Sequence, residues 1–370
     1  MGRLRGNKKL DDAVKAALAQ QVANAITNGD LEKAETLLGA ETAEGDSGDS
    51  KAAFDALIAA LKGLGERVDG LWAEVKQVEA ELEENMLWIP NLPHESVPVA
   101  ESEEGNIPWE PEGEIREFDF EPRPHWELGP ELGIIDFERG VKLAGSRAYI
   151  LLGWGAKLQR ALSNWFLDMA AQKGYREVYV PFMVNEAMMY GSAQFPKFRD
   201  VVYYDPEAEK YFLPTAEVAI TNMFREEILE EAQLPLYFVG HTPCFRREKM
   251  SAGKDVRGIK RVHQFQKVEM YKFTTPEKSY EELERMTEDA ADLCRALKIP
   301  FRRLEIATGD LGFSASKKYD IEMWSPGIQE WLEVSSCSNT EDFQARRAMI
   351  RYRREGEKKT QFVHTLNGSG

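Results

Sequence analysis

The sequence predicts an α+β protein in which an N-terminal antiparallel helical arm joins a domain that mixes strands and helices. Three zones of different character along the 370 residues support this fold class. Residues 1–88 are rich in Ala, Leu and Glu, residues 89–135 are proline-rich and irregular, and residues 136–370 carry most of the aromatic side chains. Because 43% of the residues are hydrophobic, the chain can bury a substantial core, and its length suits two or three domains.

The arm is predicted by apolar residues spaced alternately three and four apart, the seam of a coiled-coil helix packed along another helix. The seam consists of Phe54, Leu57, Leu61, Leu64, Val68, Leu71, Val75, Val78 and Leu82. A partner helix is predicted upstream, where apolar residues recur every four positions from Leu10 to Ile26. Asp30 is placed to cap a short helix over 31–38. A helical hairpin used for dimerisation is the alternative to an RNA-binding arm.

The net charge of −16 argues against a surface that binds nucleic acid broadly, because such proteins carry a basic footprint. Any RNA contact therefore needs a local basic patch. The three cysteines, Cys244, Cys294 and Cys337, form no CxxC pair, which predicts reduced thiols rather than a disulfide framework. No apolar run approaches the roughly 20 residues that cross a bilayer. These features predict a cytoplasmic protein without membrane contact.

The segment Phe245–Met270 carries the clearest chemical signal. Two strand-like stretches, near PCFRRE and QFQKVEMY, flank a loop rich in glycine and basic residues, which suits a polyphosphate. Arg246 can form a two-pronged contact with a phosphate, and Phe265 offers a face on which a base can stack. A surface hairpin with a solvated run of charge is the alternative. The loop residues are Lys249, Gly253, Lys254, Asp255, Arg257, Gly258, Lys260 and Arg261.

The order FRRE, basic loop, HQF and KVE resembles motif 2 of class II aminoacyl-tRNA synthetases. Five further segments narrow the resemblance to seryl-tRNA synthetases: PTAEVAITN at 214–222, TPCFRRE at 242–248, GDLGFSASKKYDIE at 309–322, EVSSCSNTEDFQARR at 333–347 and HTLNGSG at 364–370. The resemblance covers residues 86–370 closely. It implies a class II catalytic domain over 136–370, with an antiparallel sheet flanked by helices, a linker over 89–135 and a tRNA-binding type of arm over 1–88.

The resemblance implies an ATP site made by the hairpin and the EVSS segment. Arg246 is expected to bind the α-phosphate and, with Glu333, to be catalytic. Glu333 and Ser336 are expected to hold Mg²⁺, whose preferred ligands are oxygens. The ATP-binding residues expected in full are Arg246, Arg247, Glu248, Val262, Phe265, Glu333, Val334, Ser335 and Ser336.

The resemblance also implies a serine site beside the ATP site. Its expected residues are Thr215, Ala216, Glu217, Arg246, Glu269 and Ser369. Elementary chemistry agrees, because carboxylates anchor an ammonium group and a site that hydrogen-bonds a small hydroxyl rejects alanine. Glu217 or Glu269 taken alone is more often a solvated surface charge.

The implied reaction joins serine and ATP into seryl-adenylate and then transfers the seryl group to tRNA(Ser), and by the same resemblance to tRNA(Sec). The implied partners are serine, ATP, tRNA and a second copy, which forms a homodimer through a helix and a strand that ends at Pro181. Positioning and charge neutralisation account for such chemistry, and no general base is expected. None of the five histidines belongs to a Ser-His-Asp arrangement, and His263 is expected to be a structural neighbour of the ATP site.

Two departures from the family pattern shape the remaining expectations. The family's motif 3, with an arginine for the γ-phosphate, is expected after LNGSG, so the catalytic domain is predicted to be incomplete there and the chain shortened at both ends. Residues 1–90 contain 10 Lys and Arg against 17 Asp and Glu, although phosphate contacts favour a basic arm. The residues suited to RNA are Arg3, Arg5, Lys8 and Lys9.

Two alternative functions stay open at this stage. An amino-acid:carrier-protein ligase of similar fold has no need of a tRNA arm, which is consistent with the acidic arm. A truncated, non-catalytic paralogue that binds nucleotide or a partner is consistent with the absent motif 3 arginine. A run of arginines could also be an RNA patch, although a structural role beside the ATP-site strands is the better interpretation; the run is Arg346, Arg347, Arg351, Arg353 and Arg354.

Overall fold

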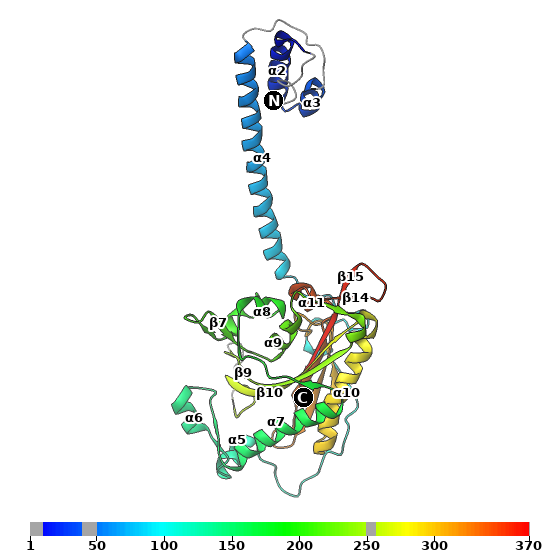
Figure 1. Cartoon of the computed structure of the whole chain (residues 1–370). Coiled ribbons are helices and arrows are strands. Elements are labelled where there is room, and N and C mark those ends of the chain that lie inside the picture. Colours follow the sequence, from blue (N-terminus) through cyan, green and yellow to red (C-terminus); the bar gives the residue numbers. More distant parts are fainter. Residues whose placement is uncertain (1–9, 39–49, 249–256, 370) are drawn as a thin grey trace. The chain divides into compact units, whose positions relative to one another are not determined.

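The computed structural model describes residues 10–38, 50–248 and 257–369, and its contacts divide the chain into two compact units, Met1–Met86 and Leu87–Gly370 (Figure 1). No helix among the described residues combines the length and the apolar character needed to cross a bilayer. Some residues singled out from the sequence lie outside the described ranges: Arg3, Arg5, Lys8, Lys9, Lys249, Gly253, Lys254 and Asp255.

The described residues of the first unit form α2 (Asp12–Thr27), α3 (Leu31–Leu38) and α4 (Ser50–Leu87), the last of which ends one residue beyond the unit. The predicted cap is confirmed, because the Asp30 carboxylate accepts a hydrogen bond from the Lys33 N–H at 3.0 Å. Leu18, Val22 and Leu57 are buried together in the core of this unit. The prediction of a helical N-terminal region is therefore confirmed.

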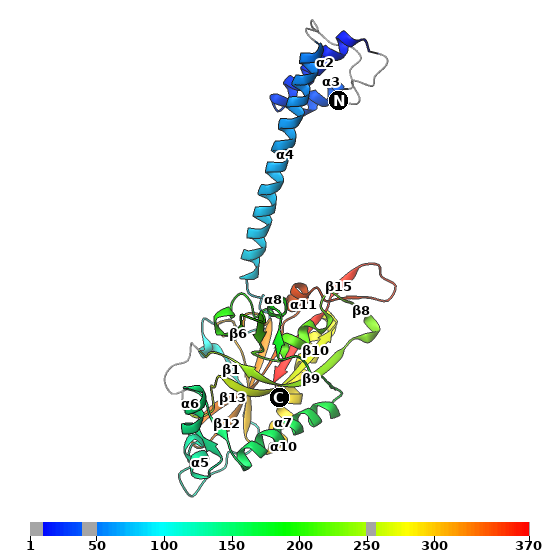
Figure 2. The ribbon, with the colours of Figure 1, turned by 60° about the vertical axis from the view of Figure 1, so that its left-hand side comes forward.

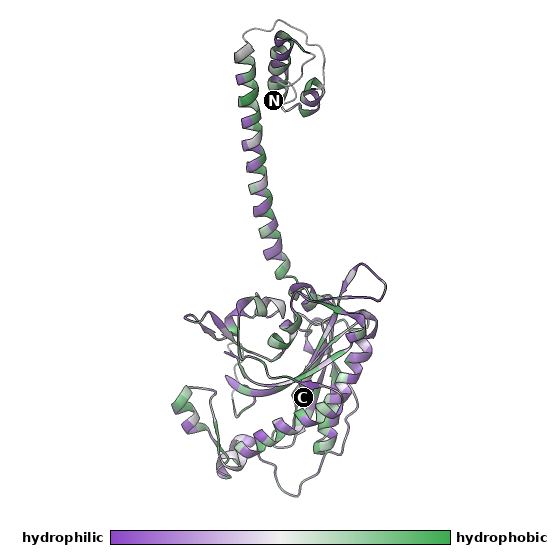
Figure 3. Ribbon diagram, viewed as in Figure 1, coloured by the Kyte–Doolittle hydropathy of each residue, from purple (hydrophilic) through white to green (hydrophobic). Residues whose placement is uncertain are grey.

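The predicted seam is covered over only part of its length. Phe54 and Leu57 pack in the core, whereas Leu71 and Leu82 are 53% and 59% exposed within the described residues. Figure 3 shows hydrophobic residues continuing along α4 beyond this core. The seam is only partly covered because α2 is much shorter than α4. The 16 residues of α2 span about 24 Å, whereas the 38 residues of α4 span about 57 Å. Within the described residues, burial of the seam is therefore limited to its first part.

The second unit is built on an eight-stranded sheet, in which every neighbouring pair is antiparallel except β4 and β9 (Figures 1 and 2). The predicted antiparallel sheet is thus confirmed. In sheet order the strands are β1 (Ile107–Pro108), β11 (Phe301–Glu305), β12 (Lys317–Ser325), β13 (Glu330–Asn339), β16 (His364–Ser369), β10 (Gln264–Thr274), β9 (Leu236–Phe245) and β4 (Arg176–Glu177).

Helices cover both faces of this sheet. On one face, α7 (Trp154–Gln172) and α10 (Ser279–Leu297) pack against a core that includes Met270 and Cys337 (Figure 2). On the other face, α8 (Glu186–Gly191), α9 (Glu217–Thr221) and α11 (Phe343–Ala348) lie over a core that includes Tyr271 and Phe273. Successive side chains of a strand point to opposite faces, so Glu269 and Tyr271 share one face while Met270 and Lys272 share the other.

Three small sheets and two short helices complete the described part of this unit. The sheets comprise β2 (Ile135–Asp136) with β3 (Ile150–Leu151), β5 (Met183–Val184) with β7 (Lys210–Phe212) and β6 (Tyr204–Asp205), and β8 (Ile228–Glu230) with β14 (Arg351–Arg353) and β15 (Thr360–Phe362). The helices are α5 (His125–Glu131) and α6 (Phe137–Ala144).

The helix and the strand that precede Pro181 follow the sequence prediction in outline. Helix α7 ends before Gly174, which has a positive φ of 91°. The strand that was predicted to end at Pro181 ends earlier, because β4 covers only Arg176–Glu177. A single further hydrogen bond, from the Val178 N–H to the Val239 carbonyl at 2.8 Å, continues its pairing with β9.

The arginine run is structural where its contacts are described. Arg346 pairs with Asp342 at 2.9 Å, and Arg354 pairs with Glu277. The Arg347 guanidinium lies 4.5 Å from the centre of the Phe343 ring, and burial lowers its pKa to about 10. These contacts support the structural interpretation over an RNA patch.

Candidate active site

The predicted hairpin forms, with β9 and β10 paired antiparallel so that Phe265 lies opposite Cys244 and Glu269 opposite Gly240. The register places Phe265, Lys267 and Glu269 on the sheet face that looks toward α9. Strand β9 ends at Phe245, so the residues of FRRE that follow belong to the neck of the loop.

Arg246 is fixed at this neck from several sides. Its backbone N–H donates to the His263 carbonyl at 3.0 Å, and its own carbonyl lies 3.0 Å from the His263 Nδ1. Its Nε donates to the Pro214 carbonyl at 3.1 Å, and its guanidinium carbon lies 5.1 Å from the Phe265 ring centre. His263 therefore stands as the structural neighbour expected from the sequence, and it holds the backbone of Arg246.

A cavity of about 700 Å³ opens beside this neck, a size typical of small-molecule sites. It brings together six of the expected ATP-binding residues, which are Arg246, Glu248, Val262, Phe265, Glu333 and Val334. Two others point elsewhere. Arg247 stacks its guanidinium 5.1 Å from the Tyr203 ring centre, and the Ser335 hydroxyl donates to the Ser369 carbonyl.

Strand β13 contains a bulge that explains how Glu333 and Ser336 reach the same face. Ser336 pairs with Asp320 and Glu333 pairs with Glu322, so Val334 is an extra residue between them. Asp320 and Glu322 are two apart on β12 and share a face, which places Glu333 and Ser336 on that face too. Without the bulge, residues three apart on a strand would point to opposite faces.

Asp320 completes an oxygen-rich group behind Ser336. One of its carboxylate oxygens lies 3.0 Å from the Lys318 ammonium, and the other is buried without a hydrogen-bond partner among the described residues. Burial, opposed by Lys318 and aided by the charge of Glu333, raises the pKa of Asp320 to about 7. Among the described residues no three His, Cys, Asp or Glu side chains form a metal cluster, so a cation here needs further ligands.

The residues that are expected to bind the substrate serine meet on the neighbouring part of the same sheet face. The Thr215 hydroxyl donates to the Glu269 Oε2 at 2.5 Å, and the Lys267 ammonium lies 2.6 Å from that same oxygen. Glu269 is fully buried, and its Oε1 has no hydrogen-bond partner among the described residues. Ser369 lies directly opposite Glu269 in the pairing of β10 with β16, and its Oγ accepts from the Ser336 N–H at 3.1 Å.

Glu217 enters the site from the first turn of α9, next to the buried Ala216. Its Oε1 accepts from the Gln344 amide at 2.6 Å and from the Asn367 amide at 3.2 Å. Burial and the nearby charge of Glu269 raise the pKa of Glu217 to about 7. Two carboxylates, one from α9 and one from β10, therefore repel each other in a buried pocket.

Sequence reasoning missed several residues of this region. The residues expected to bind serine are contacted by Lys267, Gln344 and Asn367. The cavity is also lined by His125. The His125 Nε2 accepts from the Ile259 N–H at 2.9 Å, and burial lowers the pKa of His125. Strand alternation could have revealed Lys267, two residues before Glu269. Nothing local in the sequence links His125 to the hairpin.

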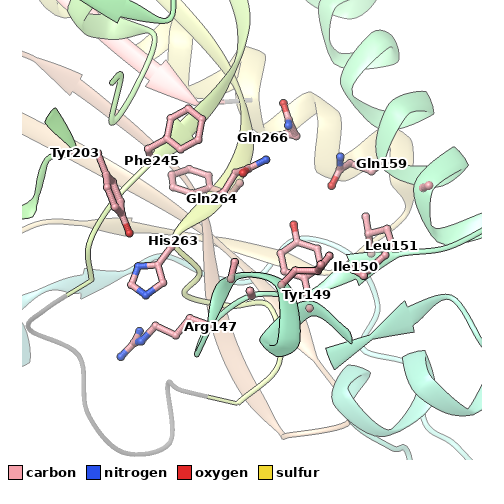
Figure 4. A pocket seen from close by; sticks show the side chains of 16 residues that line it. Arg147, Tyr149, Ile150, Leu151, Gln159, Tyr203, Phe245, His263, Gln264 and Gln266 are labelled. Atoms are coloured by element: carbon pink, nitrogen blue, oxygen red, sulfur yellow. The ribbon is translucent and has the colours of Figure 1, made fainter. Parts of the chain in front are cut away.

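A second hollow of about 670 Å³ lies at the far side of the hairpin (Figure 4). Gln264 and Gln266 line it from the face of β10 opposite to Lys267 and Glu269, and Arg147 and Tyr149 line it from the segment after α6. Among the described residues that line it there is no Asp or Glu side chain.

The fold and the site together define the core of a class II aminoacyl-tRNA synthetase. Residues 199–369 match the family described as "tRNA synthetase class II core domain (G, H, P, S and T)". The match spans the hairpin, the bulged strand β13 and β16, which are the elements that assemble the two parts of the site.

Relatives identify the family more closely. A serine–tRNA ligase of Roseiflexus sp. (strain RS-1) is 53% identical over 366 residues, covering 99% of this chain and 86% of the relative. The seryl-tRNA synthetase structure from Pyrococcus horikoshii complexed with ATP is 35% identical, with a TM-score of 0.79 over 95% of this chain and 80% of that one. A cytoplasmic serine–tRNA ligase from Naegleria fowleri in complex with AMP is 31% identical, with a TM-score of 0.79 over 99% and 86%. The chain belongs to the seryl-tRNA synthetase family.

Proposed function

We propose that this chain activates L-serine with ATP to seryl-adenylate and transfers the seryl group to tRNA(Ser). One observation carries the proposal: the buried Glu269 stands on the sheet face that also presents Phe265 and Glu333 to the cavity, and the buried Glu217 enters the same pocket from α9. A site for an ammonium group thus adjoins a cavity large enough for a nucleotide. Family membership supports the same reaction.

Serine would bind with its ammonium group against the carboxylates and its hydroxyl against a buried acceptor. The Oε1 of Glu269, which has no hydrogen-bond partner among the described residues, suits either donor, since Oε2 is already engaged. Thr215 and Glu217, on either side of Ala216, and Ser369 border the same position. Alanine would leave a buried acceptor unpaired, so the site would discriminate by hydrogen bonding rather than by size.

ATP would occupy the cavity, with its adenine between Val262 and Phe265 and its α-phosphate at Arg246. The fixed guanidinium of Arg246 suits this role, because a pre-organised fork stabilises the negative charge on the oxygens of the α-phosphate. Glu248 lines the same cavity, whereas Arg247, stacked on Tyr203, would support the neck.

The serine carboxylate would attack the α-phosphorus in line, forming a C–O–P linkage as the bond to pyrophosphate breaks. The terminal ribose hydroxyl of tRNA would then attack the carbonyl carbon of seryl-adenylate and release AMP. No side chain is assigned as a general base. Positioning of the two substrates on adjoining strands supplies the effective concentration that the first step needs.

Mg²⁺ fits the residues on the bulged strand. Glu333 and Ser336 present oxygens on one face, and the buried, unpartnered oxygen of Asp320 lies behind Ser336. Mg²⁺ prefers oxygen ligands and usually takes only a few of them from the protein. The nucleotide phosphates would fill coordination positions that the protein leaves open. When bound, the ion would neutralise phosphate charge, and Glu333 and Ser336 would orient it.

The proposal extends to assembly and location. A homodimer through α7 and the segment that ends at Pro181 is supported by exposed apolar side chains there, of which Trp154 is 73% and Tyr179 86% exposed. We assign the arm, residues 1–88, to contact with tRNA, and the reaction to the cytoplasm, where tRNA charging supplies translation. Extension of the substrate range to tRNA(Sec) belongs to the same proposal.

The test is serine-dependent exchange of labelled pyrophosphate into ATP, followed by transfer of labelled serine to tRNA(Ser) or to a carrier protein. We expect exchange with serine and transfer to tRNA. Transfer to the carrier protein alone would favour the carrier-protein ligase, which the serine–tRNA ligase relatives do not favour. ATP binding without exchange would indicate the non-catalytic alternative.

A further inference from the structure

A lysine stands inside the serine pocket beside the carboxylate that is expected to bind serine. The Lys267 ammonium lies 2.6 Å from the Glu269 Oε2 and donates to the Thr215 Oγ1 at 3.1 Å. The Lys267 side chain is 19% exposed, so this is a mostly buried charge and not a surface lysine. Three groups from β10 and from the residues before α9 thus form a closed triangle.

This triangle engages only one oxygen of Glu269. Both Thr215 and Lys267 contact Oε2, whereas Oε1 is buried with no partner among the described residues. A buried carboxylate oxygen without a donor costs free energy that a bound donor recovers. The arrangement therefore leaves one oriented acceptor in the pocket, at the carboxylate that faces the substrate position.

Lys267 also contributes to the charge balance of the pocket. Glu217 and Glu269 together carry two negative charges when ionised, and Lys267 offsets one of them. The charge of Arg246 also acts on Glu217, but its guanidinium is placed for the serine carboxylate and the α-phosphate. The remaining negative charge of the pocket matches the single ammonium of serine, which limits the cost of burying charge.

We infer that Lys267 is a positioning residue for serine: with Thr215 it clamps the Oε2 of Glu269, so that Oε1 is presented to the substrate. The inference rests on the proposed serine site and adds a residue to it. Lys267 acts through Glu269 and need not touch serine. An uncharged side chain of the same length would let the carboxylate rotate and would remove the ion pair with the Oε2 of Glu269.

The experiment compares Lys267→Met, Lys267→Arg and the wild type by calorimetric titration with serine and, separately, with ATP. We expect Lys267→Met to weaken serine binding about 30-fold, the effect of losing one buried charged hydrogen bond, and to change ATP binding less than about threefold. Lys267→Arg keeps the charge and should stay within about fivefold of the wild type for serine. Lys278→Met, at an exposed lysine before α10, is the matched control and should change neither affinity.

Each outcome bears on the inference. If the wild type binds serine and Lys267→Met binds it with unchanged affinity, the inference is overturned and the proposed function is left intact. No serine binding by the wild type would overturn both. If Lys267→Met loses ATP binding as well, Lys267→Arg decides: retained ATP binding with serine affinity near the wild type supports the clamp, and a serine loss as large as 30-fold contradicts it. A cycle with Thr215→Val should be non-additive, because both groups hold the same oxygen.

Discussion

Replacing Glu217 by glutamine should stabilise the protein at pH 8 while it weakens serine binding. The pKa of Glu217 is raised from 4.5 to about 7, first by burial and then by the charge of Glu269. Because the folded-state pKa lies above the unfolded value, the folded protein holds this proton more tightly than the unfolded chain. The free energy of unfolding should therefore be highest below about pH 4.5 and fall as the pH rises through about 7.

The magnitude follows from the same shift. A difference of about 2.5 pH units, at about 1.4 kcal/mol for each, amounts to about 3 kcal/mol of lost stability at pH 8. Glutamine removes the buried charge and keeps an oxygen that can accept from Gln344 and Asn367. Glu217→Gln should thus be more stable than the wild type by up to about 3 kcal/mol at pH 8, with the difference shrinking toward pH 4.5.

The assay is urea unfolding at several pH values from 4.5 to 8, together with serine titration at pH 8. We expect serine affinity to fall at least about tenfold, because a charged acceptor for the ammonium becomes neutral. A variant that is less stable than the wild type at pH 8 would refute the reasoning. Equal pH dependence in the two proteins would also refute it, since the titrating group would lie elsewhere.

Three further predictions follow. Gly258→Ala should raise the KM for ATP about tenfold with little effect on serine, because a Cβ there would lie 2.0 Å from the His125 Nε2 at a φ of 74°; steady-state exchange kinetics measure this. Asp320→Asn should raise the Mg²⁺ concentration for half-maximal exchange at least about tenfold, as loss of a supporting carboxylate does at metal sites, and titration with Mg²⁺ measures it. Leu57→Ala should destabilise the helical arm by about 2–5 kcal/mol without changing serine-dependent exchange, as thermal unfolding and limited proteolysis would report.

Matched variants separate these effects from general damage. Gly356→Ala has a similar positive φ of 79° and nothing within 4 Å of its Cβ, so it should leave the KM for ATP unchanged. Leu71→Ala, at a half-exposed position of α4, should cost less than about 0.5 kcal/mol. An Asp320→Asn protein with unaltered Mg²⁺ dependence would separate that carboxylate from the metal site.

Strand alternation explains how part of the candidate site is arranged. Phe265 and Glu269 occupy alternate positions of β10, and the same alternation places Lys267 beside them. The sequence analysis named the first two and omitted the lysine, because the resemblance, and not the alternation, selected the residues. The pairing of β9 with β10 confirms the hairpin that local composition predicted. Part of its basic loop lies outside the described residues.

Other features depend on contacts that no local pattern records. The extra residue in β13 that aligns Glu333 with Ser336 is visible only once β12 is paired with it. His125 meets Ile259 across 134 positions of sequence, and Gln344 meets Glu217 across 127. In the arm, periodicity predicted the helices correctly, but it could not tell how much of the α4 seam the partner helix α2 would cover.

The central claim is that the buried carboxylates beside the ATP cavity form a pocket for serine. The most direct measurement is the ratio of kcat/KM for serine to that for alanine in pyrophosphate exchange by the wild-type chain. An oriented acceptor at Glu269 predicts a ratio of at least about 10⁴, because alanine leaves that buried oxygen unpaired. A ratio below about 10 would contradict the assignment of the pocket to serine.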